Sequence, residues 1–268
     1  MLRLHTVPAS RGALWVRRGF AVFASRPLAF AALFTSFLFF GLVALLVPLV
    51  GSVLLLAAMP LVSLGFMLAS QRALQGQQPG PSVFVDPLRA GPQRRMTLLK
   101  LGLAYAVGSI AIIWLSDIAD GGKFEALQVA MASGKDDAEA IAALLADPQL
   151  QFGLMLRFGL ASLLSLPFWH APALVHWGDH GVGKALFFST LACWRNLGAF
   201  VVYGLAWAGV ILLFGVLANL LASVLQQAQL IAVAAVPAGL LLSTVFYASL
   251  YFTFSDCFAP DETEPVAS

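Results

Sequence analysis

Long runs without a charged residue dominate the pattern of apolar and polar positions along this chain. Pro27 to Gln71 is one run of 45 residues, and Asn196 to Ser255 is another of 60 residues. A helix needs about 20 apolar residues to cross a hydrocarbon core about 30 Å thick, so each run is long enough for two spans. Pro48 and Gly51 divide the first run, and a glutamine-rich segment at 226–229 divides the second.

Two shorter apolar runs bring the number of predicted membrane spans to six. Because the runs are continuous, they exclude a closed β-barrel, whose strands alternate apolar and polar residues in segments of about ten. The predicted fold class is therefore an all-α polytopic transmembrane helical bundle with basic interfacial helices. The six spans are expected at about 27–47, 51–71, 96–116, 150–176, 197–225 and 229–255.

The segments outside the spans divide the chain further. Residues 1–26 mix aromatic residues with arginines, which predicts an amphipathic segment lying at the cytoplasmic membrane interface, as an anchor or a lipid-binding element. The first span lies beyond it and leads directly into a second span, so we expect no cleaved signal peptide. The remaining parts are a membrane domain over 27–258 and a cytoplasmic tail over 259–268.

Two connections have a distinctive composition. The 73–95 loop is rich in glycine and proline and is expected to be irregular cytoplasmic chain. The 117–149 loop has a net charge of −5 and alanine-rich stretches on both sides of Ser133 and Gly134, which predict two short helices. This acidic external lobe is either a lid or partner surface, or simply a solvated face.

Charge distribution predicts the orientation in the membrane. Placing both termini in the cytoplasm puts twelve of the fifteen Lys and Arg residues there, which follows the positive-inside rule. The chain is 60% hydrophobic and 10% charged, with a net charge of +2, so the basic footprint of a nucleic-acid-binding protein is absent and no nucleic acid partner is expected. The twelve residues are Arg3, Arg11, Arg17, Arg18, Arg26, Arg72, Arg89, Arg94, Arg95, Lys100, Lys184 and Arg195.

An apolar helical segment with arginine precedes both the first and the fifth span. The two segments align so that Arg26 matches Arg195, and the start of the third span from Arg94 is a looser version of the same pattern. Successive hairpins with a shared central site, as in transporters, would explain this repetition, and so would plain duplication. Arg17, Arg18, Arg26 and Arg195 are the predicted contacts to lipid headgroups.

The cytoplasmic end of the fourth span holds three of the four histidines. On a continuous helix His176, Asp179 and His180 would share one face, which makes them a candidate metal site. Asp256 or Cys257 is a possible fourth ligand. The alternative is a set of interfacial histidines in an aromatic belt, in which case there is no metal. The alternative is favoured because Gly178 and nearby Gly181 would interrupt the helix, and no cofactor is expected.

The fourth span also contains the candidates for a polar pathway. Pro167 and Pro172 are expected to kink it, as a hinge or as part of a static bundle. Arg157 is charged inside the span, at a depth of roughly 10 Å by helical rise, from which it either snorkels to the interface or contributes to a pathway with His170. No catalytic motif accompanies these residues, so we expect that the protein is not an enzyme.

Several short motifs resemble those of uncharacterised six-helix inner-membrane proteins of Gram-negative bacteria. They are Arg26-Pro27-Leu28, Pro48 with Gly51, Asp120-Gly121-Gly122, Ala171-Pro172-Ala173-Leu174 and Trp194-Arg195-Asn196. The resemblance covers most of the chain and implies a bacterial inner (plasma) membrane location, without an activity. The helix pattern is more distantly similar to the membrane domain of some glycerophosphodiester phosphodiesterases, but no catalytic domain is expected after Ser268.

These observations predict an integral inner-membrane protein that acts through lipid or protein contacts in membrane assembly or envelope upkeep. Its expected partners are membrane lipids, and other membrane proteins or a second copy of itself. The alternative is a small transporter or permease with a site near the kinked fourth span.

Overall fold

The computed structural model describes residues 2–132, 138–226 and 229–260, and within these ranges the chain is almost entirely helical. The helices are α1 (Arg11–Ser25), α2 (Pro27–Leu45), α3 (Val50–Leu74), η1 (Pro81–Phe84), α4 (Asp86–Arg89), α5 (Pro92–Asp120), α6 (Lys123–Ala132), α7 (Ala138–Ala146), α8 (Pro148–Trp169), α9 (Ala171–Gly178), α10 (Val182–Arg195), α11 (Leu197–Leu225) and α12 (Gln229–Cys257). The strands in these ranges are β1 (Leu2–Leu4) and β2 (Phe258–Pro260). Among the described residues six helical segments are long and apolar enough to cross a membrane, which confirms the predicted all-α polytopic bundle.

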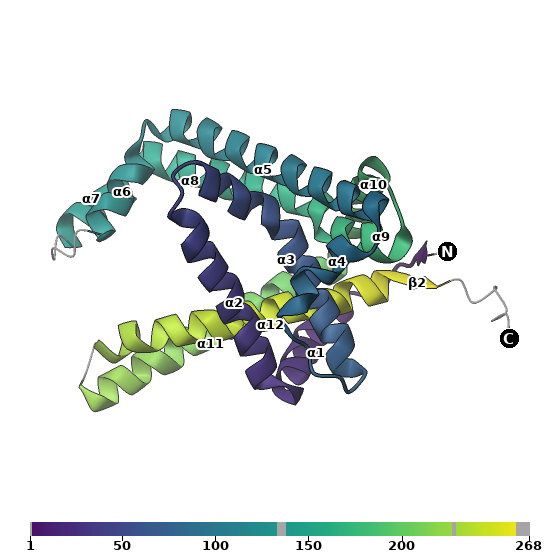
Figure 1. Cartoon of the computed structure of the whole chain (residues 1–268). Coiled ribbons are helices and arrows are strands. Elements are labelled where there is room, and N and C mark those ends of the chain that lie inside the picture. The colour runs from purple at the N-terminus through teal and green to yellow at the C-terminus, as the bar shows by residue number, and fades with distance from the viewer. Residues whose placement is uncertain (1, 133–137, 227–228, 261–268) are drawn as a thin grey trace, which may run out of the picture.

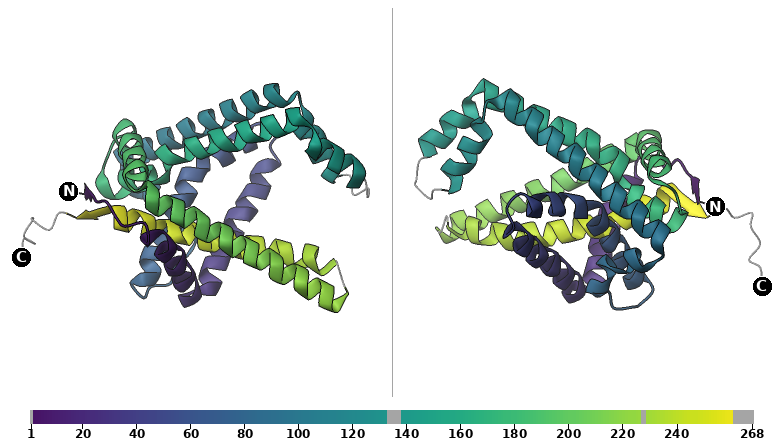
Figure 2. Two further views of the ribbon diagram at one scale, coloured as in Figure 1. Left: turned by 180° about the vertical axis from the view of Figure 1, so that it is seen from behind. Right: turned by 45° about the horizontal axis from the view of Figure 1, so that its top comes forward.

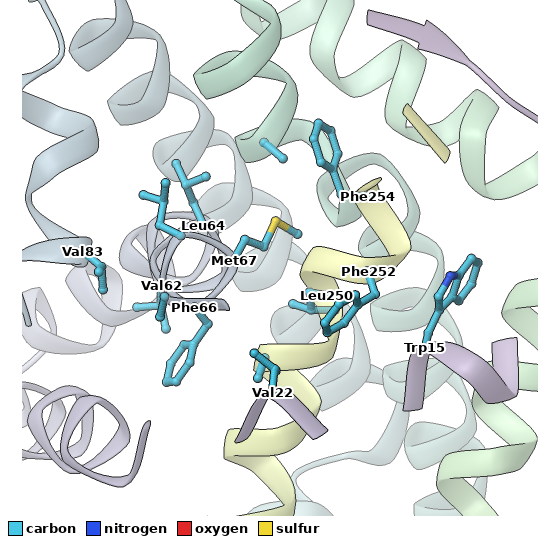
Figure 3. Packing of buried hydrophobic residues seen from close by; sticks show 14 of the residues in the cluster. Trp15, Val22, Val62, Leu64, Phe66, Met67, Val83, Leu250, Phe252 and Phe254 are labelled. Carbon is cyan, nitrogen blue, oxygen red and sulfur yellow. The ribbon is translucent and has the colours of Figure 1, made fainter. Parts of the chain in front are cut away.

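The long helices form pairs that diverge from one common end of the bundle (Figure 1). Helices α5 and α8 pack side by side, α11 and α12 form a second pair, and α2 and α3 cross obliquely near them. The strands β1 and β2 and the helices α9 and α10 lie at the common end, which we call the terminal face, whereas α6 and α7 lie at the opposite end. Helices α3 and α12 meet through apolar side chains that include Met67 and Leu250 (Figure 3).

Helix α1 packs one face against the rest of the protein. It lies against both α11 and α12 (Figure 2). Trp15 is fully buried at this contact. Gly12 faces the backbone of α11 and Gly19 faces Ser249 of α12, so closely that a Cβ atom at either position would clash. The predicted helix is present, but its apolar face meets the bundle rather than lipid, because these glycines allow a close approach.

Strand pairing joins the two ends of the chain. β1 and β2 are antiparallel, with Arg3 opposite Ala259, a pairing that the sequence pattern did not predict. Asn196, in the one-residue break between α10 and α11, accepts a hydrogen bond from the backbone N–H of Val7 at 2.8 Å and donates one to the carbonyl of His5 at 3.0 Å. The N-terminal segment is therefore attached to both β2 and the start of α11. The rest of the predicted tail, 261–268, lies outside the described residues.

Asp256 links α1 to the end of α12. Its carboxylate accepts a 2.8 Å hydrogen bond from the indole N–H of Trp15, and it forms ion pairs with Arg11 at 2.9 Å and with Arg18 at 3.3 Å. The side chain of Asp256 is only 9% exposed, so its charge depends on these partners rather than on water. The carboxylate of Asp256 is therefore bonded to α1 rather than held ready as a metal ligand.

Several element boundaries differ from those expected. α5 extends from Pro92 to Asp120, so Asp117 and Asp120 belong to the helix rather than to the lobe. The 73–95 loop is not wholly irregular, because η1 and α4 form within it and pack on α3 and α5. The predicted lobe helices are present as α6 and α7; Lys135, Asp136 and Asp137 lie outside the described residues.

Asp147 is the N-cap residue of α8 and binds that helix to α6 of the lobe. Its carboxylate accepts hydrogen bonds from the backbone N–H groups of Gln149 and Leu150, and it pairs with Lys123 of α6 at 2.5 Å. The hydrogen bond from Lys123, followed by that from Leu150, lowers the pKa of this carboxyl group. Asp147 therefore stays ionised at neutral pH, as an N-cap residue should.

Replacing Asp256 with asparagine tests the link between α1 and α12. Asp256→Asn keeps a similar shape but leaves Arg11 and Arg18 without their anion, so we expect the free energy of unfolding to fall by about 2–3 kcal/mol. Unfolding by SDS in mixed micelles measures the change.

Asp179→Asn is the matched control for this substitution. Asp179 also pairs with an arginine, Arg94, at 3.1 Å, but its side chain is 78% exposed. Water screens such a pair, so the loss should stay below about 1 kcal/mol. Equal losses in the two variants would contradict the role assigned to Asp256.

Candidate functional site

The fourth span is broken at His170, between α8 and α9. In a continuous helix the backbone N–H of His170 would bond to the carbonyl of Leu166. Here the hydroxyl of Ser189 from α10 replaces that bond: it accepts from the His170 N–H at 2.9 Å and donates to the Leu166 carbonyl at 2.8 Å. Pro167 continues within α8, and Pro172 lies in the first turn of α9. The fourth span is thus interrupted where a kink was expected. The backbone N–H and carbonyl groups at the interruption form hydrogen bonds with Ser189 of α10.

The side chain of His170 lies in an aromatic enclosure. It is fully buried, with Phe200, Phe254 and Phe258 at ring-centroid distances of 5.6 to 5.9 Å. Neither ring nitrogen has a hydrogen-bond partner among the described residues. An uncharged imidazole suits this apolar enclosure, because an isolated charge would be costly to bury. His170 therefore packs as a core side chain between α9, α11 and the end of α12.

The candidate metal face on the fourth span does not form. α9 ends at Gly178, and Asp179 adopts the left-handed conformation with φ 54°, so the helical spacing of His176, Asp179 and His180 is interrupted. Asp179 pairs with Arg94, and His180 packs against Phe188. Within the described part of the chain no group of three His, Cys, Asp or Glu residues is placed to hold a metal ion. The shared face required a helix that continues through Gly178, and the interruption expected there is present.

Arg157 belongs to a charge cluster at the end of the bundle opposite the terminal face. Its guanidinium lies 2.5 Å from a carboxylate oxygen of Asp117 and 3.6 Å from one of Asp120, and its carbon is 3.9 Å from the centre of the Phe124 ring. Asp120 is fully buried and also accepts the backbone N–H of Gly122 at 2.8 Å. The arginine is thus compensated by α5 and α6, which the sequence did not reveal because both aspartates were assigned to the loop.

Arg157 and His170 lie in different surroundings, Arg157 in the charge cluster and His170 in the aromatic enclosure. They are thirteen residues apart, about 20 Å along a helix. A cavity of about 120 Å³ does lie beside the break, between α3, α5, α8 and α12. Its lining includes Tyr105, Ser165 and Tyr247 but neither member of the predicted pathway.

The four arginines predicted to contact lipid headgroups have different surroundings. Arg18 pairs with Asp256, and Arg26 donates to the carbonyl of Gly76 at 3.0 Å, so both are used within the protein. Arg17 and Arg195 are exposed and make no ion pair with any other described residue. Lipid contact therefore remains a hypothesis that applies best to Arg17 and Arg195.

Exposed cations extend beyond that pair to α5 and α10. Arg95, Lys100 and Lys184 are also exposed, and none forms an ion pair within the described ranges. Two large apolar side chains lie beside them on α10, Phe187 with 62% exposure and Trp194 with 73%. Exposed aromatics next to cations are typical of a surface at the boundary between headgroups and hydrocarbon. We call Arg17, Arg95, Lys100, Lys184 and Arg195 the terminal cations.

The six spans and the basic terminal face define a polytopic α-helical membrane protein. The chain is 35% identical over 264 residues to a protein of Burkholderia thailandensis described as a probable inner membrane protein, covering 97% of this chain and 96% of the relative. The chain belongs to the family of that inner-membrane protein, and it is a multi-pass protein of the inner membrane. No family model and no solved structure matches it. The similarity to glycerophosphodiester phosphodiesterases stays a prediction from helix pattern.

Removing the hydroxyl of Ser189 tests the bridge across the helix break. Ser189→Ala leaves a buried N–H and a buried carbonyl without their partner, so we expect a loss of about 1–3 kcal/mol in the free energy of unfolding. SDS unfolding in mixed micelles gives the value.

Thr190→Ala on the same helix is the control, because the exposed hydroxyl of Thr190 bonds only to the carbonyl of Leu186 within α10. Its effect should stay within about 0.5 kcal/mol. If Ser189→Ala were as mild as this control, the bridge would not be what stabilises the break.

Proposed function

We propose that this protein is a non-catalytic inner-membrane component that acts through lipid and protein contacts in membrane assembly or envelope upkeep, with both termini in the cytoplasm. The observation that carries the proposal is the set of terminal cations, which have no acidic partner among the described residues. Anionic headgroups of the cytoplasmic leaflet would supply that partner.

Two further features support this proposal. The terminal face holds the basic segments of the chain, and such segments stay preferentially in the cytoplasm. Three polar side chains described above are bonded inside the protein: Ser189 bridges a helix break, and Asp256 and Arg157 are in ion pairs. They serve to hold helices together rather than being presented to a substrate.

A small transporter is the second candidate. The observation that favours it is the 120 Å³ cavity beside the break in the fourth span, where Pro60 of α3 and Phe168 of α8 face the same space. Helices interrupted at proline are suited to hinge motion, although they also occur in static bundles.

Lipid retention measures the proposed contact. Protein released from nanodiscs containing equal amounts of phosphatidylglycerol and phosphatidylethanolamine is analysed by native mass spectrometry. The wild type should retain phosphatidylglycerol preferentially, and Arg17→Gln with Arg195→Gln should reduce that preference at least about twofold, since each cation near an anionic surface contributes about 1 kcal/mol.

A variant with the same change in net charge at the other end of the molecule is the control. Ala126→Glu with Gln128→Glu alters two exposed positions of α6 and should leave the preference unchanged. If the wild type retains both lipids equally, or if both double variants lose the preference alike, the proposal is contradicted.

A further inference from the structure

A groove of about 310 Å³ lies between α2, α3 and the short helices η1 and α4. Apart from Ser36, its lining residues are apolar. Two of its walls belong to membrane spans, and the third is the connection between α3 and α5. The side chains that define its shape are Phe37 and Phe40 from α2, Ala58 and Leu61 from α3, and Phe84 and Leu88 from the connection.

The connection is firmly packed on α3. The ring of Phe84 lies against Gly65, where a Cβ atom would clash with it, and 5.7 Å from the ring of Phe66 in an edge-to-face arrangement. Arg72, in the last turn of α3, forms an ion pair with Asp86 of α4 at 2.7 Å. Close ring packing and an ion pair therefore fix this wall of the groove in place on α3.

On α3 the lining of the groove extends from Ala58 to Val62, and on α4 it includes Leu88. At one end Leu88 lies between Asp86 and Arg89 of α4, and Asp86 pairs with the C-terminal turn of α3. At the other end Ala58 is fourteen residues before Arg72, about 21 Å along the helix. One leaflet of the hydrocarbon core is about 15 Å thick, so even an oblique helix brings Ala58 close to the bilayer midplane.

Charge at the interfacial end suits a phosphate. Arg72 and Arg89 flank Asp86, and the hydrogen bond from Arg72 lowers the pKa of that carboxyl group, which is ionised at neutral pH. One anion between two cations leaves a local charge of +1. Arg89 is exposed beside Leu88, where a headgroup would lie if a chain filled the groove.

We propose that the groove between α2, α3, η1 and α4 binds one acyl chain of an anionic phospholipid of the terminal-side leaflet, with the phosphate at Arg89. This assignment rests on the proposed function and deepens it by naming one specific lipid site. The bilayer is the natural source of the occupant, because the groove lies between membrane spans and Phe40 on its edge is 44% exposed. The chain after Pro260 is polar and acidic, so it does not match an apolar groove.

Filling the groove with tryptophan tests the site. Ala58→Trp and Ser36→Trp place a large ring inside it from opposite walls, and Ala31→Trp on the exposed part of α2 outside the groove is the control. Full-length protein is released from nanodiscs of phosphatidylglycerol and phosphatidylethanolamine, and the retained lipid is counted by native mass spectrometry. Circular dichroism and SDS unfolding identify any variant that fails to fold.

We expect one strongly retained phosphatidylglycerol on the wild type and on Ala31→Trp, and at least tenfold less on both groove variants. Arg89→Gln should keep a lipid but lose the preference for phosphatidylglycerol. Unchanged retention in a folded groove variant overturns the site while leaving the general lipid contact intact. A wild type that retains no phospholipid overturns both proposals. Loss of a dimer instead of a lipid would assign the groove to a second copy and overturn this proposal.

Discussion

The hydrogen bond and the ion pairs of Asp256 hold α1 against α12, and the packing of α11 depends on α1 in this position. Although α11 and α12 run side by side, α11 packs more extensively against α1 than against α12. Helix α1 therefore connects α11 to the rest of the protein. Asp256 fixes α1 to α12 through Trp15 and two arginines, and β1 pairs with β2 next to it. In hydrocarbon, apolar contact supplies little drive for helix association, so bonds of this kind and close packing decide the arrangement.

The same constraint explains how the polar residues of the spans are used. Backbone groups in a membrane must be satisfied within the protein, and the break at His170 meets this requirement through a single hydroxyl from α10. At the opposite end Asp117 and Asp120 compensate Arg157. These bonds attach the fourth span to α10 at the break and to α5 at the opposite end.

The α2 and α3 hairpin supplies two walls of the groove that we propose holds lipid. Its groove ends near the basic residues of the connection to α5, on the same side of the protein as the terminal cations. Both proposals therefore concern one leaflet: exposed cations meet its headgroups, and the groove holds a chain from it. A protein that organises lipid on one side of a membrane would need both features.

The sequence alone determined the membrane class, the six spans and the presence of a basic and an acidic end. These follow from local composition, because a span is recognised by the length of its apolar run whatever it packs against. Tertiary structure decided which charges are free. Arg17 and Arg18 are neighbours in sequence, yet only Arg18 reaches Asp256, some 238 residues away. Such pairings depend on which helix faces meet, on close approaches at glycine, and on where a helix such as α9 ends. All of these follow from how distant segments pack together.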